Sequence, residues 1–337
     1  MSVRTSFAIF VATLALSMTT VAAGPRVVAS IKPVHSLVAA VMAGEQWRID
    51  TFVAKRDIYL ASASQITGIS YEEYIAYKEQ HGDDHPDRQN IGKVAELALG
   101  YGGWVGAWRA FDPDEANKSD DDIKNVILPW RGASPRIVNL WGGQRVRGEF
   151  GQWQDELFGF EGAAIMAITN PGQEYIPRPP STGDQTPFPV EVRFVMRHNI
   201  LRMILPSGRE LKYHEPTLEP SDQPGRQGQW SLSYMTWNTN PKYGPIGWVR
   251  MRTWGSRLFE NADQAIAHDI LRYAIINLRT AGYPTVLHVY DEIVAEIPQG
   301  TGSLEQYEAI MATLPPWAQG WPVRASGGWR GKRFRKG

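Results

Sequence analysis

An amphipathic stretch that ends in glycines, residues 88–104, restricts the fold of this 337-residue chain more than any other segment. Its apolar side chains recur at positions i, i+3, i+4 and i+7, which is the spacing of one face of an α-helix. Lys93, Leu97 and Tyr101 follow at four-residue steps and share a neighbouring face. The glycines within residues 100–103 allow the helix to end and the backbone to turn sharply. Taken alone, the stretch predicts an ordinary amphipathic helix.

A second segment, residues 285–298, has the sequence TVLHVYDEIVAEIP. Two runs of β-branched and apolar residues flank Tyr290, Asp291 and Glu292. Such runs are typical of paired strands, and a short polar junction between them is typical of a tight turn. The segment therefore predicts a β-hairpin that carries two carboxylates at its tip.

Together the two segments resemble motif B and motif C of the family A DNA polymerases, the DNA polymerase I type, and most closely those encoded by phages. Lys93 and Tyr101-Gly102 match motif B, and Asp291-Glu292 matches motif C. The text between them is similar as well, notably LPSGRELKYH, WNTNPKYGP and RLFENADQAIAHDIL. The resemblance runs from Glu45 to the C-terminus. It implies an α/β (α+β) fold with fingers helices beside an antiparallel palm sheet, without motif A, a thumb or an exonuclease domain.

The resemblance also implies a chemistry and a set of partners, which are primer-template DNA and deoxynucleoside triphosphates. Nucleotidyl transfer uses two divalent ions, and Mg²⁺ prefers carboxylate oxygens. The residues implied are catalytic Asp291 and Glu292, with Asp291 as the metal ligand; nucleotide-binding Lys93, Tyr101, Arg88 and Leu97; and DNA-binding Gln264, Arg257, Asn261 and Tyr290. Arg88 stands five residues before Lys93, where the family has four, so its contact with the triphosphate requires a local adjustment of the backbone.

The first residues of the chain do not resemble a polymerase. Residues 1–23 have a basic residue, an apolar run and Val21-Ala22-Ala23, the pattern of a cleaved secretory signal peptide that is too short to span a membrane. Residues 24–45 resemble the start of the periplasmic zinc-binding proteins of ABC transporters, and His35 is either a zinc ligand or a structural histidine. The polymerase resemblance implies the cytoplasm, whereas the signal-like start implies export, with no stable membrane association after cleavage.

Motif A is the missing part of the polymerase pattern. In this family it lies just upstream of an Ala-Gly-Glu such as Ala43-Gly44-Glu45. Its aspartate is therefore expected near Ser30 and its glutamate near His35, and neither carboxylate is there. The residues before Glu45 are expected not to complete the palm, although the apolar run Val27–Ser30 suits an added strand. Without the aspartate, little or no polymerase activity is expected.

Two functions from other classes stay open. A periplasmic zinc-binding protein is favoured by the signal-like start and opposed by the lack of later metal ligands. His81 and His85 are four residues apart, but the glycine and proline around them predict a loop that does not enforce helical spacing. A non-catalytic DNA-binding remnant is favoured by motif B and by a basic tail that contains Arg330, Lys332, Arg333, Arg335 and Lys336.

Composition and local pattern set the rest of the organisation. Apolar residues at 43% and charged residues at 21% are values of a globular chain, and the absence of cysteine excludes disulfides. Zero net charge argues mildly against a nucleic-acid partner. Residues 46–185 are expected to form the fingers and residues 186–337 the palm, with a Pro- and Gly-rich boundary at residues 171–189. Periodicity predicts a hairpin within residues 190–214 and helices over residues 261–281 and 303–314.

Overall fold

The structure, a computed structural model, describes residues 26–31, 34–112, 118–144, 157–178, 190–222, 226, 228–289 and 291–331. The signal-like residues 1–23, Tyr290 and the basic residues Lys332–Lys336 lie outside these ranges, as does much of the expected boundary at residues 171–189. In the part of the chain that is described, no helix combines the length and the apolar character needed to cross a membrane.

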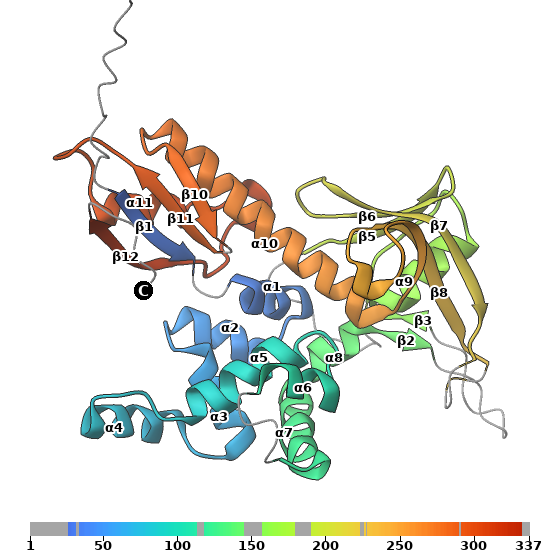
Figure 1. Cartoon of the computed structure of the whole chain (residues 1–337), viewed down its shortest axis with the longest axis horizontal. Helices are drawn as coiled ribbons and strands as arrows, with labels where there is room; N and C mark the ends of the chain where they lie inside the picture. The colour runs from blue at the N-terminus through green and yellow to red at the C-terminus, as the bar shows by residue number, and fades with distance from the viewer. Residues whose placement is uncertain are drawn as a thin grey trace, which may run out of the picture.

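Short helices make up most of the first half of the chain and lie together in the lower part of Figure 1. Ser70 and Ser119 each close a capping box at a helix start, and Gly68 and Gly82 end helices with φ angles of 80°. The helices are α1 (Val34–Ala43), α2 (Gln46–Val53), α3 (Ile58–Thr67), α4 (Tyr71–His81), the π-helix η1 (Arg88–Lys93), α5 (Val94–Leu99), α6 (Val105–Phe111), α7 (Asp120–Ala133) and α8 (Pro135–Trp141).

The helix α10 (Gly255–Thr280) runs between the two main sheets (Figure 1). Its 26 residues extend about 39 Å at 1.5 Å per residue. Of the buried stripe predicted from periodicity, Ile266, Ile270, Ala274 and Leu278 are at 0% exposure, and Tyr273 is half-buried. The expected long helix is therefore confirmed, and it begins one and a half turns earlier, at Gly255.

The larger sheet has six antiparallel strands in chain order. Each strand pairs with the next, so its register is set by local turns. One face packs on α9 (Gly159–Thr169), where the rings of Phe160 and Phe194 meet edge to face at 5.8 Å. The strands are β4 (Glu174–Tyr175), β5 (Arg193–Arg197), β6 (Ile200–Ile204), β7 (Glu210–Pro220), β8 (Trp230–Asn238) and β9 (Gly247–Thr253). The hairpin predicted within residues 190–214 is part of this sheet.

The smaller sheet combines strands from both ends of the chain in the order β10-β11-β1-β12. Its strands are β1 (Arg26–Ile31), β10 (Thr285–Val289), β11 (Glu292–Glu296) and β12 (Ala325–Gly331), with α11 (Leu304–Met311) between the last two in sequence. β1 pairs with both β11 and β12, so it fills the middle of the sheet. The expectation that the residues before Glu45 do not complete the palm is therefore wrong for the backbone, because the added strand is central.

The helix after β1 is equally integrated. Nine of the ten residues of α1 are buried, and the helix packs on α8 and α10. Glu45 follows it and accepts backbone hydrogen bonds from Arg136 and Ile137 at 2.9 and 3.3 Å, which caps the start of α8. The junction at Glu45 is thus inside one packed body. The residues expected to form a single palm, 186–337, divide between the two sheets.

Candidate functional site

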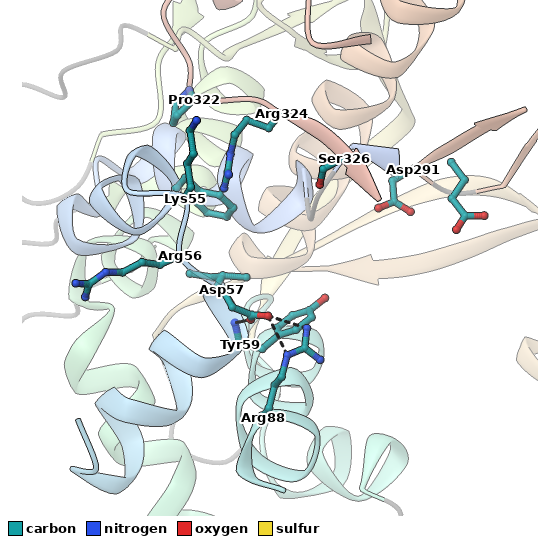
Figure 2. Close-up of a pocket in the computed structure, with 12 residues that line it drawn as sticks. Lys55, Arg56, Asp57, Tyr59, Arg88, Asp291, Pro322, Arg324 and Ser326 are labelled. Carbon is teal, nitrogen blue, oxygen red and sulfur yellow. Dashed lines mark hydrogen bonds and ion pairs between the residues drawn. The ribbon is translucent and has the colours of Figure 1, made fainter. Parts of the chain in front are cut away.

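The predicted hairpin is present and places its carboxylates on the wall of a cavity. β10 and β11 pair antiparallel, and Asp291 lies in the turn directly before Glu292. The cavity has a volume of about 450 Å³ and is shown in Figure 2. Besides these two residues, its charged lining consists of Asp57, Lys55, Arg56, Arg88 and Arg324. Three carboxylates and four cations therefore surround one cavity.

The neighbouring strands of this wall carry no carboxylate at the same level. β1 has the sequence RVVASI, and its Ser30 stands directly opposite Glu292 in the ladder. On the other side Ser30 pairs with Ser326 of β12, which lines the cavity. The point at which the motif A aspartate is expected is thus occupied by serines on two adjacent strands.

These residues fit the two Mg²⁺ ions of a polymerase poorly. Mg²⁺ requires octahedral oxygen coordination and is usually held through carboxylates. Asp291 and Glu292 are adjacent in one turn, and the described ranges contain no group of three or more His, Asp or Glu side chains placed to hold a metal ion. The donor set suits one weakly held ion rather than two.

Motif B begins as a π-helix, which differs from the expected regular helix. Arg88 to Lys93 form η1, and α5 continues from it without a break. In a π-helix the hydrogen bonds run from residue i to residue i+5, so residues five apart come close to one face. The π-helical turn therefore accommodates the unusual five-residue spacing, because it brings Arg88 and Lys93 close to the same face of the helix. The helix then ends at Leu99, and Gly102 turns the chain with a φ of 80°, as the glycines predict.

Gly92 allows this π-turn to pack directly on α3. A Cβ atom on Gly92 would lie 1.9 Å from the carbonyl oxygen of Tyr59, so only glycine fits. Tyr59 and Asp291 line the same cavity, and Figure 2 shows Tyr59 near Asp57 and Arg88. The backbone contact therefore fixes how closely motif B approaches α3, which carries Tyr59.

Arg88 reaches the cavity while already paired. Its Nε and Nη2 atoms lie 2.9 and 2.7 Å from Oδ2 of Asp57 (Figure 2). Its Nε also lies 3.5 Å from Oδ2 of Asp84. Asp57 also caps α3 by accepting from the backbone of Tyr59 at 2.8 Å. An incoming phosphate would therefore compete with Asp57 for the guanidinium.

A buried ion pair anchors the helix of motif B. Nη1 of Arg48 lies 2.7 Å from Oε2 of Glu96, and the two side chains are 1% and 2% exposed. Ser134 accepts two further hydrogen bonds from Arg48, and the indole of Trp130 donates to Glu96. Burial raises the pKa of Glu96, but Arg48 and these hydrogen bonds outweigh burial and hold it below its ordinary value. The carboxylate is therefore charged and satisfied inside the core.

A second cavity, of about 680 Å³, adjoins the first through Asp291, which lines both. Its lining brings together Leu97 and Tyr101 of motif B with Gln264 of α10, three of the residues that the resemblance implies. His35 and Tyr59 also line it. The two cavities thus unite motif B, motif C and α10.

Tyr101 is held in place by a hydrogen bond to α10. Its hydroxyl donates a hydrogen bond to Oδ2 of Asp263, which is 0% exposed. Burial raises the pKa of Asp263 well above its ordinary value, and burial beside this carboxylate raises the pKa of Tyr101 as well. Asp263 lies within the similar stretch RLFENADQAIAHDIL, but the resemblance gives it no role, and only its place on the buried side of a helix could have suggested one.

His35 stands where the motif A glutamate is expected and lines the second cavity. Burial lowers the pKa of its imidazole, against the opposing effect of Glu96 and Asp291. Its Nε2 atom is buried without a hydrogen-bond partner. The position therefore presents a neutral ring in place of a carboxylate.

The other implied DNA contacts are not all at the cavities. Asn261 donates to the hydroxyl of Tyr213 at 2.9 Å, and Arg257 lies 3.9 Å from the sulfur of Met251, so both face the six-stranded sheet. Gln264 lines the second cavity and donates to Glu260 at 3.2 Å. Of the residues that sequence missed, Lys55, Arg56 and Arg324 lie in segments without a motif, and only folding brings them together.

Comparison with known proteins agrees with this geometry. The chain is 33% identical over 302 residues to the DNA polymerase of Bacillus phage SP02, a match that covers 89% of this chain. The resemblance to a family A DNA polymerase is confirmed. The fold matches the POL domain of Pol1 from M. smegmatis in complex with DNA primer-template and dNTP, with a TM-score of 0.52 and 15% identity over 92% of this chain. No family model matches the chain.

The chain spans 40% of the length of each of these two proteins. The stretch matched to the phage polymerase is longer than the part of this chain that follows Glu45, so the similarity continues upstream of it. Neither comparison supports the likeness of residues 24–45 to a periplasmic zinc-binding protein. The similarity to the phage polymerase therefore extends at least into α1, and the positions at which the motif A carboxylates are expected hold Ser30 and His35.

Proposed function

We propose that the chain is the fingers and palm part of a family A DNA polymerase that binds nucleotide and primer-template at the two cavities but transfers nucleotides weakly or not at all. The observation that carries the proposal is the position of Asp291 on the wall of both cavities. One cavity has the cations that a triphosphate requires, and the other has the apolar and aromatic side chains that a base requires.

The proposed nucleotide position follows from the charges. Lys55, Arg88 and Arg324 line the first cavity and would attract the triphosphate. Leu97 and Tyr101 would contact the base in the second cavity, with Tyr101 held in place by Asp263. A phosphate that displaces Asp57 from Arg88 would link nucleotide binding to the start of α3, which Asp57 caps.

The proposed loss of catalysis follows from the residues on strands β1, β11 and β12, which we call the sheet wall of the site. Two bound ions stabilise the charge that develops during nucleotidyl transfer, and each position depends on shared carboxylates. Asp291 and Glu292 supply one side, and β1 supplies serine where the partner aspartate is expected. Template-directed synthesis by this chain is therefore expected to be absent or at trace level.

The proposed partners, primer-template DNA and deoxynucleoside triphosphates, imply a place of action in the cytoplasm. The signal-like residues 1–23 are the opposing prediction. N-terminal sequencing of the chain after expression in bacteria distinguishes the two, because export by a cleaved signal would remove these residues.

Nucleotide binding tests the proposal apart from catalysis. Equilibrium binding of a fluorescent deoxynucleoside triphosphate to the full chain on primer-template should weaken about tenfold in Arg324→Ala and in Lys55→Ala, both of which remove a cation of the first cavity, since a hydrogen bond to a charged group contributes about 1.5–3 kcal/mol. Lys124→Ala is the matched control, because Lys124 pairs with Asp121 on the surface of α7. Equal affinity in all three variants and the parent would contradict the proposal.

A further inference from the structure

The ribbon formed by β8, η3 (Pro241–Tyr243) and β9 lies at the other end of α10 from the hairpin (Figure 1). We call it the β8–β9 ribbon. The sequence from Gln223 to Phe259 contains no acidic residue. It contains five cations, Arg226, Lys242, Arg250, Arg252 and Arg257. Arg226 pairs with Glu161 at 2.6 Å and Arg257 contacts Met251, so the outward positive charge comes from Lys242, Arg250 and Arg252.

Two tryptophans form an exposed aromatic pair on this ribbon. Trp237 and Trp248 stand directly opposite each other in the ladder and are 56% and 57% exposed. Their ring centroids lie 6.0 Å apart at an interplanar angle of 89°, and the ring of His214 in β7 lies 5.6 Å from that of Trp248 in β9. More than half of each indole is left in water, although tryptophan is usually largely buried.

Arg250 and Arg252 lie on the same outer face of the sheet as this pair. Residues along β9 alternate between the two faces, so Trp248 and Arg250 point outward while Met251 contacts Arg257 of α10. Arg250 donates to neutral oxygens at 3.1–3.4 Å, those of Glu215 (backbone), Thr217 and Ser233. Its guanidinium is therefore held in place without losing its charge to these partners. Arg252 pairs with Asp222 at 3.1 Å and contributes less.

The tip of the ribbon is rigidly built. The side-chain amide of Asn238 donates to the backbone oxygens of Gly244 and Pro245, both at 3.0 Å. The side chain of Asn240 accepts from the backbone of Lys242, also at 3.0 Å. These bonds fix the turn that joins the two tryptophans, so the aromatic pair is preorganised.

We propose that the outer face of the β8–β9 ribbon binds single-stranded nucleic acid, with bases stacked on Trp237 and Trp248 and phosphates near Arg250 and Lys242. Every base has a π face, so such stacking tolerates any sequence, and the basic excess is complementary to the phosphates. A duplex is disfavoured because its bases are already stacked inside. A second copy of this ribbon is disfavoured because two basic surfaces would repel each other.

Fluorescence anisotropy of a labelled 15-residue oligo(dT) with the full chain tests the proposal. Trp237→Ala and Trp248→Ala should each weaken binding about tenfold, as expected for the loss of one stacked base. Trp248→Phe keeps an aromatic face and should stay within about twofold of the parent. Lys242→Gln should reduce the slope of log affinity against log salt concentration by about one unit.

Trp230→Ala is the matched control, because Trp230 lies in the same ribbon and is 43% exposed but points to the opposite face. It should bind oligo(dT) like the parent. Equal binding by Trp237→Ala, Trp248→Ala and Trp230→Ala would overturn the proposal. A change of sedimentation coefficient in the two outer-face variants, with unchanged oligo(dT) binding, would overturn it in favour of a protein interface.

Discussion

The candidate site has a helical wall, formed by motif B with α3 and α10, and a sheet wall, and the two differ in what they provide. The helical wall has a buried ion pair that anchors motif B, a π-turn packed on α3, and Tyr101, which is hydrogen-bonded to α10. The sheet wall has its strand order and its central strand β1, but a serine stands where an aspartate is expected. Apolar residues can therefore determine the backbone structure around such a site even where the carboxylates needed for catalysis are missing. The chain is therefore expected to bind nucleotide and primer-template without transferring nucleotides.

The largest effect is expected where the helical wall depends on a buried charge. Glu96→Ala leaves the guanidinium of Arg48 unpaired in the core, and breaking a buried pair costs about 3–5 kcal/mol. Urea unfolding monitored by circular dichroism measures the loss. Glu72→Ala removes an exposed pair with Arg56 and is the control, for which little change is expected. A similar loss in both variants would show that the Arg48–Glu96 pair does not anchor motif B.

The next expected effect is a pH dependence of the free energy of unfolding, caused by Asp263, which accepts the hydrogen bond of Tyr101. The pKa of Asp263 is raised in the folded chain above its ordinary value of 3.8, so the folded state binds the proton more tightly than the unfolded state. Its contribution to stability is present below about pH 3.8 and is lost as pH rises, by up to about 1.4 kcal/mol per pH unit. Asp263→Asn should therefore gain stability relative to the parent between pH 4 and pH 7. A difference that stays constant over this range would contradict the raised pKa.

A smaller effect distinguishes two glycines of the helical wall. Gly92→Ala would place a methyl group against the carbonyl of Tyr59 and should destabilise the fold by about 1–3 kcal/mol. Gly106→Ala lies in α6 with nothing within 4 Å of the added carbon, and it should stabilise by up to about 1 kcal/mol. Thermal unfolding of both variants checks the pair. Equal shifts in the same direction would mean that the π-turn can move away from α3.

Much of the fold follows from local sequence. The β10–β11 hairpin and the buried stripe of α10 are confirmed, because alternation and 3.6-residue periodicity lie within one segment. The strands predicted within residues 190–214 are confirmed for the same reason, since hairpin turns set their register. The division into fingers and palm at residues 185 and 186 stays a prediction.

The features that sequence did not reveal are non-local. The central place of β1 depends on pairing with strands at the far end of the chain, and an apolar run alone does not specify its partners. Three of the four cations of the first cavity, Lys55, Arg56 and Arg324, come from the turn between α2 and α3 and from the segment before β12, which carry no motif. The π-helix required one extra residue in motif B, and the five-residue spacing was its only trace in the sequence.

The most direct test of the central claim is extension of a labelled primer on a template by the full chain, with Mg²⁺ and all four deoxynucleoside triphosphates. No extension by the chain itself is expected. Ser30→Asp should give detectable extension, because it adds the missing carboxylate to a strand already paired beside Glu292. The double variant Ser30→Asp, Asp291→Ala should lose that extension. Robust synthesis by the unaltered chain that disappears in Asp291→Ala would contradict the claim that the sheet wall lacks an essential carboxylate.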